Sequence, residues 1–176
     1  MKSRTILITG GQRSGKSQEA ERLALSLSDN PVYLATAQVL DQEMARRVAL
    51  HQQRRGPEWT NIEEPTRLSR HDLGGRVVLL DCLTLWLTNL LFAHEDADGE
   101  DPVQCVLQQA KAEFDALVAR SDATFIVVTN EIGLGGVSQN KLQRQFTDLQ
   151  GWMNQYVAQL ADEVYLMVSG IAVKIK

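Results

Sequence analysis

The sequence predicts an α/β protein in which helices flank a mainly parallel β-sheet and an antiparallel hairpin closes the C-terminal edge. Three observations support this fold class. Short strand-like apolar runs alternate with helical segments, a glycine-rich stretch follows the first of these runs, and the last two runs are separated only by Ser169-Gly170. The length of 176 residues suits one domain, which we assign to residues 1–176.

The first half of the chain is predicted to contain three strands and two helices. Its strands lie at residues 5–9, 32–36 and 77–80, and its helices at residues 16–28 and 41–55. The strands are short apolar runs, and the first helix carries small apolar side chains at steps of three and four. Asn30-Pro31 and Gly56-Pro57 end the two helices, because proline cannot continue a helix.

The second half continues the alternation and ends in the hairpin. Its helices lie at residues 83–92, 102–120 and 141–161, and its strands at residues 124–129, 163–168 and 171–175. The helix at 141–161 has the clearest amphipathic spacing and is expected to pack on the sheet. The helix at 83–92 is apolar on almost every side, which predicts burial in the core or against a neighbouring subunit.

The glycine-rich stretch has the spacing of a phosphate-binding loop. It reads Gly10-Gly11-Gln12-Arg13-Ser14-Gly15-Lys16-Ser17, directly after the first strand and at the start of the first helix. In such a loop the backbone N–H groups and the helix dipole attract phosphate, and Lys16 reaches the outer phosphates of a nucleoside triphosphate. The loop and its context predict a P-loop NTPase fold of the RecA-like type.

Asp81 follows the third strand, at the edge of the sheet where α/β proteins bind ligands. A carboxylate at this position holds Mg²⁺ beside the hydroxyl of Ser17, so the sequence predicts a magnesium site made by these two residues. The alternative is an aspartate that only caps the next helix. The motifs of a switch GTPase are poorly matched, because residues 72–75 precede a strand and residues 140–143 lack the acidic residue that reads guanine.

The predicted helix at 41–55 places His51 among arginines. Arg47 and Arg55 lie one turn away on either side, and Arg54 lies three residues beyond. Composition alone favours an ordinary structural or surface histidine. A neutral imidazole is also a nucleophile near pH 7, and guanidinium groups neutralise a phosphate under attack, so phosphorus chemistry is the second interpretation.

Composition limits the kinds of partner and the cellular compartment that we expect for this protein. The formal charge of −4 argues against a general nucleic-acid surface. Cys82 lies in an apolar stretch and is expected to be a buried free thiol, which suggests a reducing compartment. We expect a cytoplasmic protein without a membrane span, because no signal-peptide pattern and no long apolar window is present. Residues 95–101 are mostly acidic, which predicts a solvent-exposed loop between two helices.

A set of motifs along nearly the whole chain carries a resemblance to one family. Besides the phosphate loop, the matching pieces are residues 33–37, the D-x-E-M-x-x-R-x-x-x-H pattern from Asp41 to His51, Trp59 with Glu63, residues 81–84 and 88–91, residues 129–133, Arg144, Phe146, Asp148, Gly151, Asn154 and Gln155, and the ending at 168–176. In these motifs the sequence resembles the bifunctional adenosylcobinamide kinase / adenosylcobinamide-phosphate guanylyltransferase family of cobalamin biosynthesis.

The resemblance implies two reactions. The first passes the terminal phosphate of ATP or GTP to adenosylcobinamide. The second moves GMP from GTP, through a guanylylated His51, to adenosylcobinamide phosphate, which gives adenosylcobinamide-GDP and releases pyrophosphate. The resemblance also implies a homotrimer, with Lys16 and His51 as catalytic residues. The nucleotide-binding residues that we expect beside the loop are Ala35, Thr36, Ala37, Arg54, Arg55 and Glu63.

Two alternatives and several details stay open at this stage. The first alternative is a P-loop kinase that phosphorylates another small molecule with a hydroxyl group, and in which His51 has no catalytic role. The second is a nucleotide-dependent assembly protein that transfers phosphate to no small molecule. Sequence does not choose between ATP and GTP in the kinase step, nor between one nucleotide site and two. Asp81 and Glu131 are both candidates for the base that deprotonates the acceptor hydroxyl.

Overall fold

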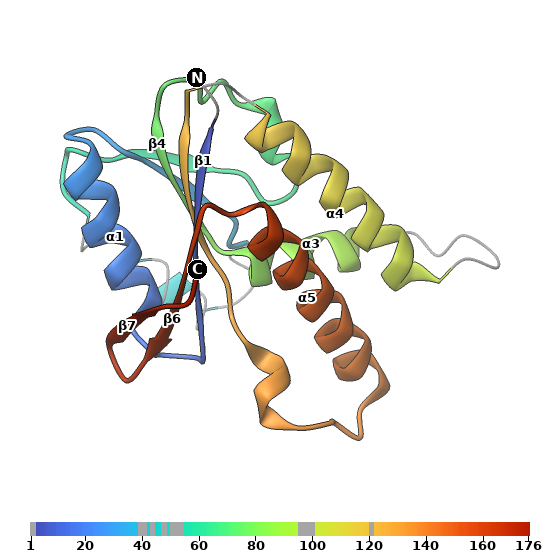
Figure 1. The fold of residues 1–176 in the computed structure, drawn as a ribbon. Helices are drawn as coiled ribbons and strands as arrows, with labels where there is room; N and C mark the ends of the chain where they lie inside the picture. Colours follow the sequence, from blue (N-terminus) through green and yellow to red (C-terminus); the bar gives the residue numbers. More distant parts are fainter. Residues whose placement is uncertain are drawn as a thin grey trace.

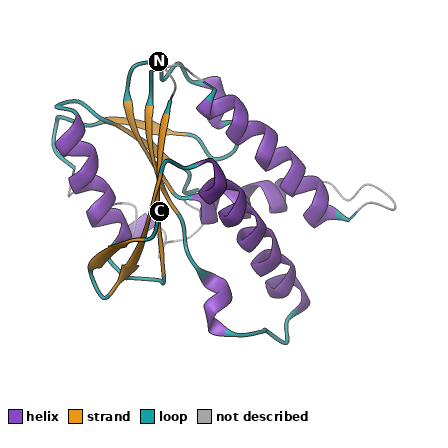
Figure 2. Cartoon of the chain, in the orientation of Figure 1, coloured by secondary structure: helices purple, strands orange, loops and turns teal. Residues whose placement is uncertain are grey.

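A computed structural model describes residues 3–38, 42, 45, 46, 49, 55–94, 101–119 and 122–176. Within this part of the chain, one seven-stranded sheet lies between two layers of helices. Figure 1 shows α1 on one side of the sheet and α3, α4 and α5 on the other, and Figure 2 shows the same layers by element type. The predicted α/β architecture is confirmed.

The elements follow the chain in the alternation that the sequence predicts. Their bounds are β1 (Arg4–Gly10), α1 (Lys16–Leu27), β2 (Val32–Ala35), β3 (Thr60–Glu63), η1 (Leu68–Arg70), β4 (Val77–Asp81), α3 (Leu83–Ala93), α4 (Pro102–Val118), β5 (Thr124–Val128), η2 (Ile132–Gly135), α5 (Lys141–Leu160), β6 (Glu163–Val168) and β7 (Ile171–Lys174). Within the predicted helix at 41–55, the described positions 42, 45, 46 and 49 are helical, whereas Arg55, at its predicted end, is not.

The strands lie in the order β3-β2-β4-β5-β1-β6-β7. All neighbours are parallel except β6 and β7, which form the antiparallel edge hairpin that the sequence predicts. The parallel register places the carboxyl ends of β3, β2, β4 and β5 in one row, with Glu63, Ala35, Asp81 and Val128 as successive partners. The candidate site lies along this row and at the end of β1.

Alternate residues of the strands belong to two hydrophobic cores, one on each face of the sheet. Leu7, Leu34, Leu80 and Val127 face α3, α4 and α5, whereas their neighbours Ile8 and Leu79 face α1. This alternation is what a parallel sheet covered on both faces requires, and it explains why each strand is a continuous apolar run.

Two local features differ from the sequence expectations. Strand β3 was not predicted, because Thr60–Glu63 alternates half-buried and exposed side chains at the outer edge of the sheet and carries little apolar signal. Helix α3 is fully buried at Leu83, Trp86, Leu87 and Leu90, its other positions up to Leu91 are half-buried, and Phe92 is 74% exposed. No helix in the described part of the chain has the length and apolar character to cross a membrane.

Candidate functional site

The predicted phosphate loop joins β1 to α1 at the carboxyl edge of the sheet. Its curvature depends on backbone conformations that favour glycine, with φ of +152° at Gly10 and +97° at Gly15, and Arg13 also has a positive φ of +57°. Gly10 leaves no room for a side chain, because an added Cβ would lie 2.6 Å from the carbonyl oxygen of Met167. Gly10 and Gly15 are therefore required by the fold of the loop, whereas a Cβ at Gly11 would meet nothing within 4 Å.

The N-terminus of α1 faces this loop without a side-chain cap. Gly15 occupies the N-cap position, and its carbonyl accepts the first helical hydrogen bond from the N–H of Glu19 at 3.1 Å. The N–H groups of the first turn are therefore not used by a capping side chain and can donate to a phosphate, at the positive end of the helix dipole.

Lys16 folds back across the loop. Its Nζ donates to the carbonyl oxygen of Gly11 at 2.6 Å and lies 3.5 Å from Ser14 Oγ. The residue is only 7% exposed, and burial lowers the pKa of its ammonium, while nearby negative groups, including Asp81, oppose that change. A triphosphate bound in the loop would stabilise the charged form of this ammonium, which burial disfavours.

Asp81 is held at the end of β4 by a buried tyrosine. The Tyr33 hydroxyl donates to Asp81 Oδ2 at 2.6 Å, and burial together with this carboxylate raises the pKa of Tyr33. The guanidinium of Arg55 lies over the Tyr33 ring, with its Cζ 3.5 Å from the ring centre. Nε and Nη1 of Arg55 are buried and have no hydrogen-bond partner among the described residues, so this cation has donors to offer an anion at the site.

The donor set at this edge fits the predicted Mg²⁺. Ser17 lies in the first turn of α1 and Asp81 acts electrostatically on the neighbouring Lys16, so hydroxyl and carboxylate oxygens stand at the same end of the sheet. Among the described residues no group of three or more His, Cys, Asp or Glu side chains is placed to hold a metal. Magnesium suits such a sparse site, since it is commonly held by one or two side chains and by the phosphates of the substrate.

Thr36 follows β2, and its side chain serves the backbone next to Asp81. Its Oγ1 donates to the carbonyl oxygen of Cys82 at 2.8 Å and accepts from the N–H of Cys82 at 2.9 Å. The predicted free thiol of Cys82 is confirmed as buried, and burial raises the pKa of this thiol to about 12. Thr36 therefore supports the Asp81 strand end, and Cys82 is a protonated thiol at neutral pH.

A buried polar network occupies the end of β5. Thr129, Gln150 and Asn154 bond to one another at 2.7 to 2.9 Å, and Asn154 Nδ2 donates to the carbonyl oxygen of Asn130 at 3.0 Å. The network continues to Glu131, whose Oε2 accepts from Thr9 Oγ1 at 3.1 Å. The end of β5 is thus tied both to helix α5 and to the strand that leads into the phosphate loop.

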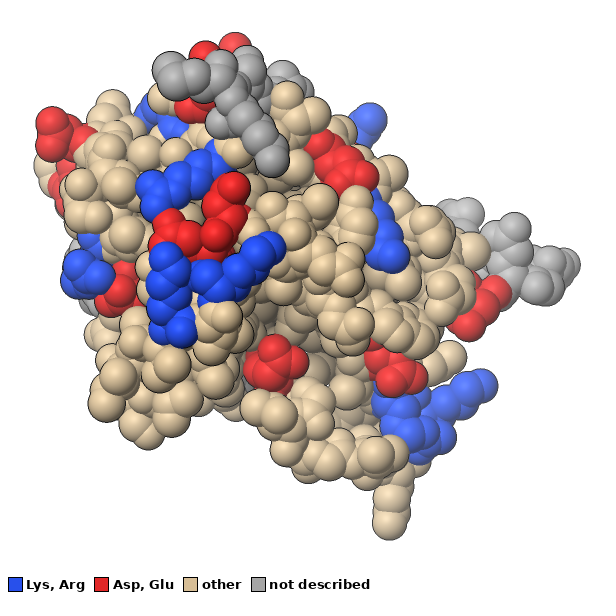
Figure 3. Space-filling model, viewed as in Figure 1, with Lys and Arg blue, Asp and Glu red and all other residues tan. Residues whose placement is uncertain are grey.

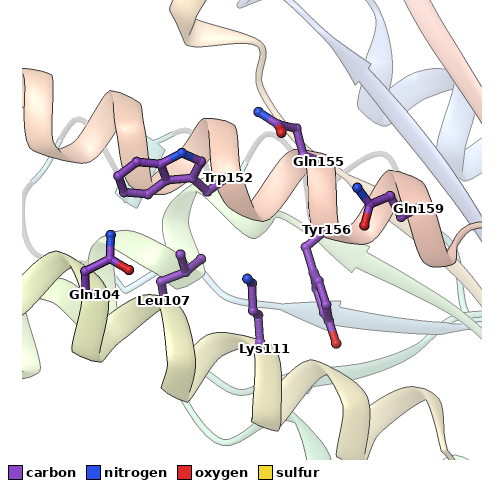
Figure 4. Close-up of a pocket in the computed structure, with 7 residues that line it drawn as sticks. All are labelled: Gln104, Leu107, Lys111, Trp152, Gln155, Tyr156 and Gln159. Carbon is purple, nitrogen blue, oxygen red and sulfur yellow. The ribbon is translucent and has the colours of Figure 1, made fainter.

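A cavity of about 300 Å³ lies elsewhere, between α4 and α5. Figure 4 shows Trp152, Gln155, Tyr156 and Gln159 of α5 opposite Gln104, Leu107 and Lys111 of α4. Figure 3 shows Lys and Arg side chains interspersed with carboxylates over the described part of one face, where no broad area of one sign is seen.

The structure brings some of the predicted site residues together and separates others. The phosphate loop, Asp81, Arg55, Ala35 and the residues after it share the carboxyl edge of the sheet. Glu63 ends β3, four strands from β1, which corresponds to about 19 Å at the usual strand spacing of ~4.8 Å. His51 and Arg54 lie outside the described residues, so their roles stay predictions, as do those of the other assigned residues.

Sequence reasoning assigned no role to Tyr33 or to the network of Thr129, Gln150 and Asn154. Tyr33, Thr129 and Asn154 do belong to motifs that carry the resemblance. Their function is visible only through hydrogen bonds between segments that are 21 to 48 residues apart in sequence. No local sequence pattern predicts hydrogen bonds between segments this far apart.

The chain is similar to known proteins along nearly its whole length. The family model described as cobinamide kinase / cobinamide phosphate guanyltransferase matches residues 6–175. The bifunctional adenosylcobalamin biosynthesis protein CobU of Escherichia coli is 44% identical over 181 residues, which cover 97% of this chain and 99% of the relative. The CobU protein of Salmonella typhimurium is also 44% identical over 99% of its length, and the CobP protein of Pseudomonas aeruginosa is 41% identical over 96%.

Among solved structures, a protein of Pyrococcus horikoshii superposes with a TM-score of 0.52 at 7% identity, over 98% of this chain and 86% of that one. At this identity the likeness concerns the fold alone.

Proposed function

The chain belongs to the cobinamide kinase / cobinamide phosphate guanyltransferase family, and from this premise we propose that it phosphorylates adenosylcobinamide and then transfers GMP to the product. It is a bifunctional transferase of adenosylcobalamin biosynthesis, as its relatives are. The finer statement, that GMP travels through a guanylylated His51 to give adenosylcobinamide-GDP, is our proposal. One domain carries both reactions.

One observation carries the proposal in the structure. The phosphate loop, with Lys16 folded across it and an uncapped α1 N-terminus, stands at the same edge of the sheet as the Asp81 carboxylate. This is the arrangement that binds the β- and γ-phosphates of a nucleoside triphosphate and neutralises charge on the group that leaves. The family match supplies the substrate, because the loop alone does not distinguish corrinoid from other acceptors.

In the kinase step the loop holds the triphosphate in line with the acceptor hydroxyl. Backbone N–H groups of the loop and Lys16 bind the outer phosphates, and Ser17 and Asp81 would hold Mg²⁺. When bound, Mg²⁺ would neutralise charge on the phosphate oxygens. The buried tyrosine Tyr33 keeps the Asp81 carboxylate in place through its hydrogen bond at 2.6 Å.

In the guanylyl transfer the same loop holds the β- and γ-phosphates, which leave as pyrophosphate. The nucleophile is the imidazole of His51, which attacks the α-phosphorus, and GMP then passes to the phosphate of the corrinoid. Arg55 supports this step, because its guanidinium lies over the Tyr33 ring and has buried donors without partners in the described part of the chain. Arg54 and the more distant Glu63 are proposed to contact the same nucleotide.

The test uses protein-bound label. We expect the wild-type protein, incubated with Mg²⁺ and α-labelled GTP, to acquire a label that is labile to acid and stable to alkali, as a phosphohistidine bond is. His51→Ala should carry less than about 1% of this label, since a histidine nucleophile cannot be replaced by a methyl group. The measurement is the radioactivity that stays with the denatured chain.

The matched control is His94→Ala, which removes the histidine at the C-cap of α3 and should leave the label at the wild-type amount. Absence of label in the wild type, or full label in His51→Ala, would exclude His51 as the carrier of GMP. A γ-labelled triphosphate in the same experiment reports phosphate transfer to adenosylcobinamide separately.

The proposal includes a homotrimer in the cytoplasm that does not act on nucleic acid. Exposed apolar side chains that support association include Phe92 of α3, 74% exposed, and Ile171 of β7, 68% exposed. The formal charge of −4 supports the absence of a nucleic-acid partner.

A further inference from the structure

We infer that Glu131 is the general base of the phosphoryl-transfer step and accepts the proton of the corrinoid hydroxyl. This inference rests on the proposed function, because it names the base for the kinase half of that function. It concerns a residue that follows β5 and that neither the phosphate loop nor the Asp81 strand end includes.

The backbone places Glu131 at the root of the phosphate loop. Strand β5 is the direct parallel neighbour of β1, and the N–H of Glu131 donates to the carbonyl oxygen of Gly10 at 3.0 Å. Gly10 is the first glycine of the loop, so the chain leaves β5 beside the point at which the loop begins. The carboxylate of this residue therefore lies beside the start of the loop that binds the triphosphate.

The side chain is oriented by the polar network of Thr129, Gln150 and Asn154. Oε2 of Glu131 accepts from Thr9 Oγ1 at 3.1 Å and lies 3.5 Å from Asn154 Nδ2. Asn154 is itself fixed, because its Oδ1 accepts from Thr129 Oγ1 at 2.7 Å and from Gln150 Nε2 at 2.8 Å. These bonds leave the other carboxylate oxygen, Oε1, without a hydrogen bond to any described residue.

Such an arrangement suits a base. One oxygen anchors the group in a set geometry, and the second oxygen is available to a substrate proton. Glu131 is half-buried, so solvent reaches it while the network holds it. Thr9, Asn154 and Gln150 act as positioning residues through their bonds.

Asp81, the other strand-end carboxylate named for this role, is committed elsewhere. Its Oδ2 accepts the buried Tyr33 hydroxyl at 2.6 Å, and its charge acts on Lys16. It is also the carboxylate whose position suits Mg²⁺, and a group that holds a cation is a poor proton acceptor. The two carboxylates therefore have separate roles: Asp81 would hold Mg²⁺, and Glu131 accepts the proton.

The step balances as follows. The acceptor hydroxyl oxygen forms a bond to the γ-phosphorus, and the bond between that phosphorus and the β–γ bridging oxygen breaks. The nucleoside diphosphate leaves with the electron pair of that bond. The hydroxyl proton passes to Oε1 of Glu131, which releases it to solvent after the phosphorylated corrinoid departs.

The decisive variant is Glu131→Gln. The amide oxygen can still accept from Thr9 and Asn154, so the network is kept and only the basic carboxylate is lost. We expect kcat for phosphorylation of adenosylcobinamide to fall by about 100-fold or more, the range over which general bases contribute. Nucleotide Kd, measured with a fluorescent triphosphate analogue, should change by less than about threefold.

Two further measurements complete the test. Protein guanylylation from α-labelled GTP has no hydroxyl acceptor, so it serves as the reference reaction in the same variant. Glu131→Ala should regain part of its kinase rate when formate is added, because formate supplies a carboxylate in the space left empty. Asp115→Asn, which changes a carboxylate of α4 that accepts from Tyr156, is the control for removal of a hydrogen-bonded acid.

The outcomes separate the two claims. A loss of kinase rate in Glu131→Gln with nucleotide binding and guanylylation retained supports the base. A kinase rate within about threefold of wild type, or an equal loss in both reactions, overturns it while the proposed function stands. A wild-type protein that phosphorylates no adenosylcobinamide overturns the proposed function itself.

Discussion

At the scale of single residues, the most consequential contact is the buried bond from Tyr33 to Asp81. Tyr33 is 3% exposed, and Trp59 packs edge-on against its ring at 5.8 Å between ring centres. The buried Tyr33 side chain therefore satisfies its hydroxyl through the Asp81 carboxylate, 2.6 Å away. A hydrogen bond to a charged group in such surroundings contributes more than a neutral bond at the surface.

Tyr33→Phe should lower the free energy of unfolding by about 1.5–3 kcal/mol, because Asp81 loses a buried hydrogen-bond donor while the ring keeps its packing. Urea unfolding at pH 7, followed by tryptophan fluorescence, measures this. Tyr156→Phe is the matched control, since Tyr156 also donates to an aspartate at 2.6 Å but at an exposed site, and it should cost less than about 0.5 kcal/mol. Equal costs for the two variants would contradict the argument from burial.

At the scale of elements, the edge hairpin braces the phosphate loop. The turn between β6 and β7 has positive φ at Ser169 and Gly170, and the N–H of Gly170 donates to the carbonyl oxygen of Ser14 at 3.0 Å. Gly15 approaches this turn closely, because an added Cβ would lie 3.3 Å from Gly170 Cα. The last two strands thus help to set the shape of the loop near the start of the chain.

Gly10→Ala tests this brace at its tightest point. The new Cβ would lie 2.6 Å from the backbone carbonyl of Met167 in β6, which cannot move without disturbing the sheet. We expect a loss of about 2–4 kcal/mol in the free energy of unfolding and a nucleotide affinity at least about tenfold weaker.

The matched control for that prediction is Gly75→Ala. Gly75 also has a positive φ, +70°, but an added Cβ there meets nothing within 4 Å, so only the backbone strain of about 1 kcal/mol remains. If Gly10→Ala costs no more than Gly75→Ala in urea unfolding, the close contact with Met167 is not what requires glycine.

At the scale of the whole molecule, Glu163 ties the start of β1 to the C-terminal hairpin. Glu163 begins β6, and it pairs with Arg4 of β1 and with Lys174 of β7, whose Nζ lies 2.8 Å from Oε2. The hydroxyl of Tyr165 donates to the same oxygen at 2.7 Å. Hydrogen bonds from Lys174, Arg4 and Tyr165 together lower the pKa of Glu163 from 4.5 to about 2.

This pKa predicts a window of pH in which the molecule loses stability. A carboxyl group whose pKa is lowered by folding stabilises the folded state above pH 4.5, and this contribution is lost as the pH falls toward 2. Glu163→Gln should therefore unfold at lower urea concentration than wild type at pH 7, and the difference should shrink as the pH falls from 4.5 to 2. A difference that stays constant with pH would show that the pairing with Arg4 and Lys174 does not stabilise the fold.

Much of the fold could be predicted because its signals are local. Each buried strand is a short apolar run, α1 and α5 show helical spacing, and the loop from Gly10 to Ser17 has a fixed pattern of glycines. Strand β3 escaped prediction because its side chains alternate between half-buried and exposed, so its place in the sheet depends on backbone pairing with β2. Leu142 and Leu160 of α5 follow the helical spacing, yet their exposed fractions are 49% and 44%. Periodicity predicts the apolar face of a helix but does not show how much of that face other elements cover.

The sequence by itself determined the fold class, the phosphate loop, the strand-end position of Asp81 and the family, because each of these depends on residues that are close together in the chain or on motifs in a set order. Only the tertiary structure decided which groups stand beside that loop. The pairing of Tyr33 with Asp81, the anchoring of Glu131 by Thr9 and Asn154, and the contact of Gly170 with Ser14 each join segments far apart in sequence. Such contacts follow from the strand order and from packing of helices on the sheet, and no local pattern of side chains encodes them.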